Sequence, residues 1–152
     1  MVERDYESIA ASLDDEGTIE ERMRRVADVL WDKLSPTGVS WVGFYLPDGA
    51  DQLILGPSRN KPACSPIGLH GACGQVFLSG QPLVVHDVRD LGESYVACDP
   101  RDQSEVVLPL FGENNRPWAV LDLDSFDIGA FAEHDVAGLR RVLCAAGLTR
   151  DN

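Results

Sequence analysis

The sequence contains no apolar run that approaches the roughly 20 residues of a membrane-spanning helix. Its first residues also lack the basic start and the apolar stretch of a signal peptide. Basic residues are scarce, because 13 Lys and Arg stand against 25 Asp and Glu and give a formal net charge of −12. Such a surface repels phosphate backbones and anionic lipids. We therefore expect a cytoplasmic protein that has neither nucleic acid nor a membrane as a partner.

Internal repeats, low-complexity tracts and linker-like segments are also missing. A chain of 152 residues has the usual length of one compact domain with a hydrophobic core. Hydrophobic residues make up 44% of the chain and charged residues 25%, which is ordinary for a globular protein and argues against disorder. The composition predicts one folded domain.

Close cysteine pairs are absent as well, since no Cys-x-x-Cys occurs among the four cysteines. The three histidines complete no zinc-binding pattern with them; they are His70, His86 and His134. We therefore expect no metal site. In a reducing compartment, four cysteines favour catalysis or redox chemistry over structural disulfides.

Three cysteines lie in segments rich in glycine and proline: Cys64, Cys73 and Cys98. The remaining one, Cys144, belongs to the apolar stripe of a predicted helix and is expected to be a small buried hydrophobe. Cys98 lies in a long polar connection over residues 87–103, and long irregular loops in compact domains are often functional. These positions predict a thiol redox site between residues 61 and 105.

Helical spacing of apolar residues occurs at both ends of the chain. It predicts a short helix over residues 3–14 and a stronger one that begins after Thr18 and ends near residue 34. Thr18 and Glu21 have the spacing of a capping box. A final helix is predicted over residues 133–146.

Between these predicted helices, the residue pattern has the shorter period of β-strands. Strands are predicted over 39–46, 52–55, 83–86, 105–111 and 118–123, with a loop over 56–71 and a short helix over 72–79. Helices at both ends of a run of hairpin-connected strands predict an α+β domain. Its central sheet is mainly antiparallel and is flanked by N- and C-terminal helices.

Acidic and aromatic residues recur with strand spacing. Asp122 and Asp124 alternate with leucines, so both point to one face of the sheet, which is either solvated or a pocket. In a pocket, these two acids and Glu105 from the adjacent strand could bind a cation or donate a proton. Trp41 and Tyr45 also share a face, for which core packing is the ordinary explanation.

Several of these pieces together resemble one family, the free methionine-(R)-sulfoxide reductases, which are built on a GAF domain. The matching pieces, in order, are Trp41-Val42-Gly43-Phe44-Tyr45-Leu46, Lys61-Pro62-Ala63-Cys64, Ala72-Cys73-Gly74, Ala97-Cys98-Asp99, Ser104-Glu105-Val106-Val107 and Val120-Leu121-Asp122-Leu123-Asp124-Ser125. The resemblance implies a single GAF domain over residues 1–152. Within it, a helical segment spans 3–34, the sheet with its active-site loops spans 39–124, and a C-terminal helix spans 133–146.

The resemblance also implies roles for the matching residues. Cys98 aligns with the nucleophile that attacks the sulfoxide sulfur and becomes a sulfenic acid. Cys64 aligns with the cysteine that resolves it to a disulfide, and Cys73 with a third cysteine that shares this work in some members. Glu105 and Asp124 match acids that polarise the S=O bond, while Trp41, Tyr45 and Asp122 match residues that hold the substrate.

The implied reaction is the thiol-dependent reduction of free L-methionine-(R)-sulfoxide to L-methionine. It uses no cofactor, thioredoxin serves as the reductant, and the protein forms a homodimer. Two segments that form the lid around the substrate, 65–72 and 92–96, depart from the family pattern and leave the reaction type intact. The alternative is a non-catalytic GAF-type sensor of redox state or of a small ligand that uses the same cysteines.

Overall fold

Two helices open the fold in the computed structural model, which describes residues 2–60, 63–95 and 98–150. They are α1 (Tyr6–Ala11) and α2 (Ile19–Leu34), and the predicted capping box of Thr18 and Glu21 begins α2. The first helix is shorter than the predicted range of 3–14. Asp5 caps its start by accepting a hydrogen bond from the backbone N–H of Ser8. Arg4 instead extends into the interior, where it forms a buried ion pair with Asp135 at 3.0 Å.

The described strands form one antiparallel sheet in the order β3-β2-β1-β6-β5-β4. Their bounds are β1 (Val39–Asp48), β2 (Gln52–Arg59), β3 (Ile67–Gly68), β4 (Leu83–Val85), β5 (Ser104–Phe111) and β6 (Pro117–Ser125). The predicted α+β fold with a mainly antiparallel sheet is therefore confirmed. The central strands β1, β6 and β5 carry the predicted acidic and aromatic residues.

The stretch 56–71, predicted to be a loop, instead contains part of β2 and all of β3. The register of β2 against β1 shifts at a bulge, where Gly56 and Pro57 face the single residue Phe44. A proline at a bulge loses no ladder hydrogen bond, so pairing resumes beyond it and β2 reaches Arg59. β3 then pairs with the start of β2.

The remaining elements are helices and 3₁₀ turns. They are η1 (Ser35–Thr37), α3 (Ala72–Ser79), η2 (Val88–Ser94) and α4 (Glu133–Ala145). The short helix over 72–79 and the final helix are thus confirmed to within a residue. The connection over 87–103 is not wholly irregular, because η2 occupies its first half, with a kink at Gly92.

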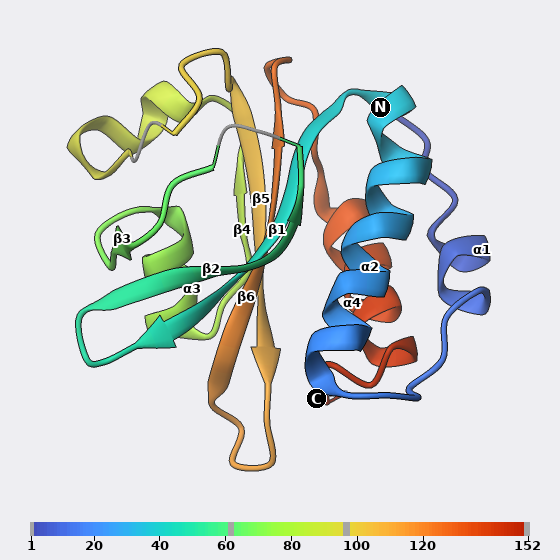
Figure 1. Ribbon diagram of the computed structural model, residues 1–152. Coiled ribbons are helices and arrows are strands. Elements are labelled where there is room, and N and C mark those ends of the chain that lie inside the picture. The colour runs from blue at the N-terminus through green and yellow to red at the C-terminus, as the bar shows by residue number, and fades with distance from the viewer. Residues whose placement is uncertain (1, 61–62, 96–97, 151–152) are drawn as a thin grey trace.

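The two faces of the sheet are covered differently (Figure 1). The helices α2 and α4 pack on one face, α1 lies outside them against α4, and the larger hydrophobic core here includes Phe44, Leu121 and Leu139. The short α3 and the long connections lie on the other face. Cys144 on α4, predicted to be a small buried hydrophobe, is half-buried. None of the helices within residues 2–60, 63–95 and 98–150 has the length and apolar content that crossing a membrane requires.

Candidate active site

A pocket lies on the face of the sheet opposite the long helices and encloses about 540 Å³, part of it open to solvent. Seven of the eight predicted site residues line it: Trp41, Tyr45, Cys73, Cys98, Glu105, Asp122 and Asp124. The eighth, Cys64, is joined to Cys98 by a disulfide. The structure therefore brings together all of the residues that the sequence proposed for one site.

Strand register gathers the acids on the floor of the pocket. Asp124 on β6 lies directly opposite Glu105 on β5 and opposite Trp41 on β1. Asp122 is two residues earlier, on the same face, and stands opposite Gly43. Because side chains alternate along a strand, these acids share one face while the leucines between them enter the core. The face is a pocket rather than a solvated surface.

Trp41 and Tyr45 form an aromatic wall beside the acids. Both are buried, and their ring centroids lie 6.0 Å apart. The indole of Trp41 lies across Gly43, where a Cβ would collide with the ring, so a residue without a side chain is required there. The two aromatics pack together, as the core explanation expected, and also line the pocket.

The wall and the floor each present a buried polar atom that no described protein atom satisfies. Nε1 of Trp41 is an unused donor, and Oδ1 of Asp122 is an unused acceptor. Buried polar groups in folded proteins are nearly always hydrogen-bonded, so such atoms in a pocket indicate where a ligand binds. The site offers complementary groups to a polar ligand with an apolar part.

The disulfide lies at the side of this pocket. Cys64 and Cys98 have a Cα–Cα distance of 5.4 Å, within the usual range for a disulfide. The hydroxyl of Tyr45 donates a hydrogen bond of 2.8 Å to the backbone carbonyl oxygen of Cys64. Asp99, next to Cys98, pairs with Arg101 at 2.8 Å, so its charge is largely balanced.

The acids on the floor bind protons more tightly than exposed carboxyl groups do. Burial raises the pKa of Asp122 and Asp124 well above the usual range, and the negative charges of neighbouring acids add to the rise. Burial also raises the pKa of Glu105, although hydrogen bonds from Asp122 and Asp124 partly offset it. These carboxyl groups can therefore share protons and donate hydrogen bonds to a ligand oxygen.

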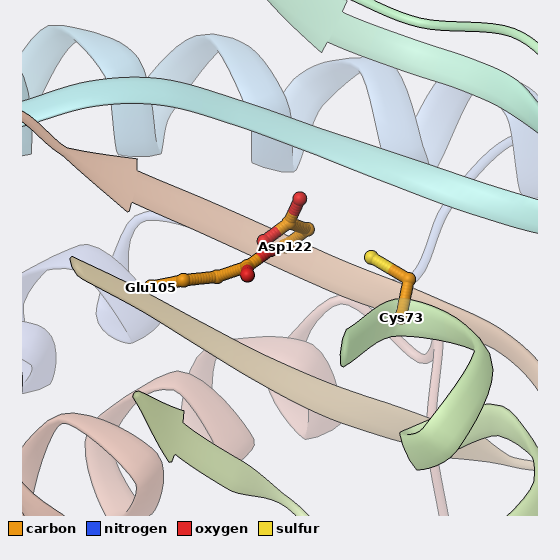
Figure 2. A group of neighbouring side chains, drawn as sticks. All are labelled: Cys73, Glu105 and Asp122. Carbon is orange, nitrogen blue, oxygen red and sulfur yellow. The ribbon is translucent and has the colours of Figure 1, made fainter. Parts of the chain in front are cut away.

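Cys73 approaches the acids from the start of α3 (Figure 2). Its thiol donates a hydrogen bond to Asp122, and burial followed by the charges of the three acids raises its pKa well above normal. One ligand atom each from Cys73, Glu105 and Asp122 lies within 4.8 Å of the others, so these residues could hold a divalent metal ion. Alternatively, the same side chains share protons among themselves and bind no metal ion.

Two pocket residues with polar side chains were missed by the sequence reasoning. Asp102 is buried and lines the pocket close to Glu105, and Tyr95 contributes to the wall. Burial and the charges of Asp99 and Glu105 raise the pKa of Asp102 to about 7. Both residues come from the irregular connection before β5, where no periodicity indicates which way a side chain points. Of the altered segment 92–96, residue 96 lies outside the described residues.

Comparison with known proteins agrees with this geometry. The GAF domain family matches residues 16–148. Free methionine-R-sulfoxide reductase from Escherichia coli is 34% identical over 92% of this chain and 81% of its own length. The fold and the site therefore define a GAF-domain protein with a thiol pocket.

Two solved structures are similar over nearly the whole chain. Free methionine-R-sulfoxide reductase from Neisseria meningitidis, in complex with its substrate, has a TM-score of 0.80 and 32% identity, with 95% of this chain and 87% of that chain covered. The reduced form of fRMsr from Staphylococcus aureus has a TM-score of 0.83 and 30% identity, with 95% and 94% covered. The chain belongs to the free methionine-R-sulfoxide reductase family of GAF-domain proteins.

Proposed function

We propose that the protein reduces free L-methionine-(R)-sulfoxide to L-methionine with its own cysteine thiols. The observation that carries this proposal is the Cys64–Cys98 disulfide beside a pocket floored by three proton-holding acids. Membership of the reductase family supports the substrate.

Cys98 is the proposed nucleophile. Its thiol attacks the sulfoxide sulfur, the S–O bond of the substrate breaks, and the oxygen ends on Cys98 as a sulfenic acid while methionine leaves. The sulfoxide is reduced by two electrons and the thiol is oxidised by two. A thiolate displaces sulfoxide oxygen poorly unless that oxygen accepts a proton or a strong hydrogen bond. Glu105 and Asp124 are the proposed donors, because their raised pKa values keep protons available in the pocket.

Resolution of the sulfenic acid requires a second thiol within reach. Cys64 is the proposed resolving residue, since it is the partner of Cys98 in the disulfide. Cys73 is the proposed reserve, because it is buried in the same pocket. A thioredoxin-type dithiol then returns the disulfide to two thiols by exchange, so the proposed reaction needs no bound cofactor. We place this cycle in the cytoplasm, as the sequence composition predicts, and in a homodimer, as the resemblance implies.

The groups around the pocket suit a free amino acid. Trp41 and Tyr45 offer an apolar wall to the methylthio end, and the unsatisfied Oδ1 of Asp122 offers an acceptor to the α-ammonium group. A methionine sulfoxide inside a peptide lacks that ammonium group and brings flanking backbone. We therefore expect discrimination against peptide-bound substrate.

The testing experiment couples turnover to NADPH oxidation through thioredoxin and thioredoxin reductase, with separated R and S sulfoxides as substrates. The free R isomer should be reduced, whereas the S isomer and an R-sulfoxide inside a blocked peptide should react at least tenfold more slowly. Absence of methionine from freshly reduced protein would contradict the proposal. Cys144→Ser, which changes a cysteine on the other layer of the fold, serves as the matched control and should turn over normally.

A redox sensor is the second candidate, because a reversible Cys64–Cys98 disulfide could itself be the signal. The two functions differ in what forms the disulfide. Stoichiometric methionine production with each disulfide formed supports the reductase. Disulfide formation with peroxide but not with methionine sulfoxide would support the sensor.

A further inference from the structure

The side chain of Tyr45 lies beside both the substrate pocket and the resolving cysteine of the proposed reaction. Its ring packs beside Trp41 on the pocket wall, with 6.0 Å between the ring centroids. Its hydroxyl reaches in another direction and donates a hydrogen bond of 2.8 Å to the carbonyl oxygen of Cys64. The same side chain therefore contacts the substrate space through its ring and the backbone of the resolving cysteine through its oxygen.

The position of this hydroxyl is fixed by the sheet. Tyr45 lies on β1, where it pairs with Leu55 of β2 on one side and with Val120 of β6 on the other. Its side chain is 3% exposed. Burial, and then the charge of Asp122, raise the pKa of Tyr45, so the phenol keeps its proton and remains a donor. The donor is rigid and permanent.

The segment that carries Cys64 has a second attachment to the sheet. The backbone N–H of Leu55 donates a hydrogen bond of 3.0 Å to Oγ of Ser65. Tyr45 and Leu55 are register partners, so both attachments come from one position across the β1–β2 pair. Between them they hold Cys64 where its Cα lies 5.4 Å from that of Cys98.

We propose that the hydroxyl of Tyr45 is a positioning group for the resolving step, in that it holds the backbone of Cys64 so that its thiol meets the sulfenic acid of Cys98. The inference rests on the proposed reductase function. In the step concerned, the sulfur of Cys64 attacks the sulfur of Cys98. An S–S bond forms, the S–O bond breaks, and the hydroxyl leaves as water with the proton of the thiol. No external oxidant or reductant takes part.

This role belongs to the hydroxyl and is separable from the contact that the ring makes with substrate. Removing only the oxygen leaves the aromatic wall in place but frees the carbonyl of Cys64. The effect should therefore fall mainly on disulfide formation, after methionine has been released. A general weakening of the fold would instead slow both steps together.

The experiment compares the two steps in single turnovers of reduced wild type and Tyr45→Phe. Rapid quenching measures methionine release, and alkylation by a dimedone-type probe measures how long the Cys98 sulfenic acid survives. Loss of one hydrogen bond should slow resolution by about 3- to 10-fold relative to methionine release. An unchanged ratio of the two rates in Tyr45→Phe would overturn the inference.

The controls separate positioning from other effects. In a Cys64→Ser background residue 64 can no longer resolve the sulfenic acid of Cys98. Adding Tyr45→Phe should then change the lifetime of this sulfenic acid by less than about twofold. Tyr95→Phe removes another phenol oxygen from the pocket wall and should leave the ratio of the two rates as in wild type. An equal effect of Tyr95→Phe, or a full effect in the Cys64→Ser background, would count against positioning.

A second variant tests the same idea if Tyr45→Phe does not fold. Ser65→Ala removes the other attachment of the Cys64 segment and should also slow resolution relative to methionine release. A normal ratio there would contradict the inference. Failure of the proposed function looks different, because wild type itself would then release no methionine.

Discussion

The two faces of the central sheet use the same strands for opposite purposes. On β6, Leu121 and Leu123 enter the core under the long helices and are fully buried. Asp122 and Asp124, between and beside them, face the pocket. One face follows the rule that apolar groups are buried, and the other gathers three carboxyl groups where burial disfavours their charge.

This difference separates the residues that stabilise the fold from those that carry chemistry. The helix face, which is the face of the sheet that lies under the long helices, gains free energy from every apolar group that it removes from water. The pocket face holds acids with raised pKa values, an unsatisfied Asp122 oxygen and an unsatisfied Trp41 donor. Local conflicts of this kind are expected where a structure serves function rather than stability. Exchanging single residues on the two faces should therefore produce opposite patterns of lost activity and lost stability.

The largest effect is expected from Cys98→Ser on the pocket face. A hydroxyl is a far weaker nucleophile than a thiol, so methionine formation should fall by at least on the order of 10³-fold. Because Cys98 is only half-buried, the unfolding free energy of the reduced protein should change by less than about 1 kcal/mol. Coupled turnover and urea unfolding of reduced wild type and variant measure the two quantities. Retained activity would exclude Cys98 as the nucleophile.

Leu121→Ala should give the reverse pattern from the neighbouring helix face. Leu121 is completely buried in the larger core, so truncation leaves a cavity and should cost roughly 2–5 kcal/mol of unfolding free energy. The protein that remains folded should keep most of its kcat/KM, because the leucine points away from the pocket. Chemical unfolding and assays at low temperature test this. A large loss of kcat/KM in fully folded protein would show that the faces are coupled.

Asp122→Asn, one residue along the chain, sharpens the comparison by changing charge at nearly constant shape. Asparagine keeps an acceptor oxygen but cannot carry the negative charge that would pair with the ammonium group of the substrate, so kcat/KM should fall by about 10- to 100-fold. At pH 8 the variant should be as stable as wild type or more stable by about 1 kcal/mol, because a carboxyl that burial disfavours is gone. Kinetics with free substrate and urea unfolding at pH 8 measure both. Clear destabilisation together with normal kcat/KM would reverse the assignment.

The sequence was sufficient for the sheet face and its acids because alternation along a strand is a geometric rule. The strand pattern alone places Asp122, Asp124 and Glu105 together, although only the folded chain shows that they face a pocket. The pairing of Cys64 with Cys98 came from resemblance, since their separation in the chain says nothing of their distance in space. Helix bounds at α2 followed from a capping box with a clear local cause.

Other features depend on contacts that no local pattern records. Gly56 and Pro57 indicate a loop by composition, yet a bulge accommodates them and β2 continues to Arg59. The first helix begins later than predicted, at Tyr6, because the side chain of Arg4 has a buried partner far along the chain, Asp135. Asp102 was missed because its burial results from the path of a connection rather than from periodicity.

The smallest effect concerns the dependence of stability on pH, and it follows from that missed residue. The pKa of Asp102 rises from an ordinary value of 3.8 to about 7 in the folded protein, through burial and then the charges of Asp99 and Glu105. The folded state then binds a proton that the unfolded state has released between these values. The stability that this group contributes is fully present below about pH 4 and is lost as pH rises to about 7, by about 1 kcal/mol in total once solvent screening of this group is taken into account. Asp102→Asn should therefore gain stability relative to wild type as pH rises from 5 to 8.

Urea unfolding of the two oxidised proteins at each pH measures the difference, and Asp51→Asn in the exposed turn after β1 controls for the loss of one negative charge. A difference between Asp102→Asn and wild type that stays constant across this range would mean that Asp102 is already ionised in the fold. The raised pKa values of the pocket face would then belong to the floor acids Glu105, Asp122 and Asp124 and not to Asp102.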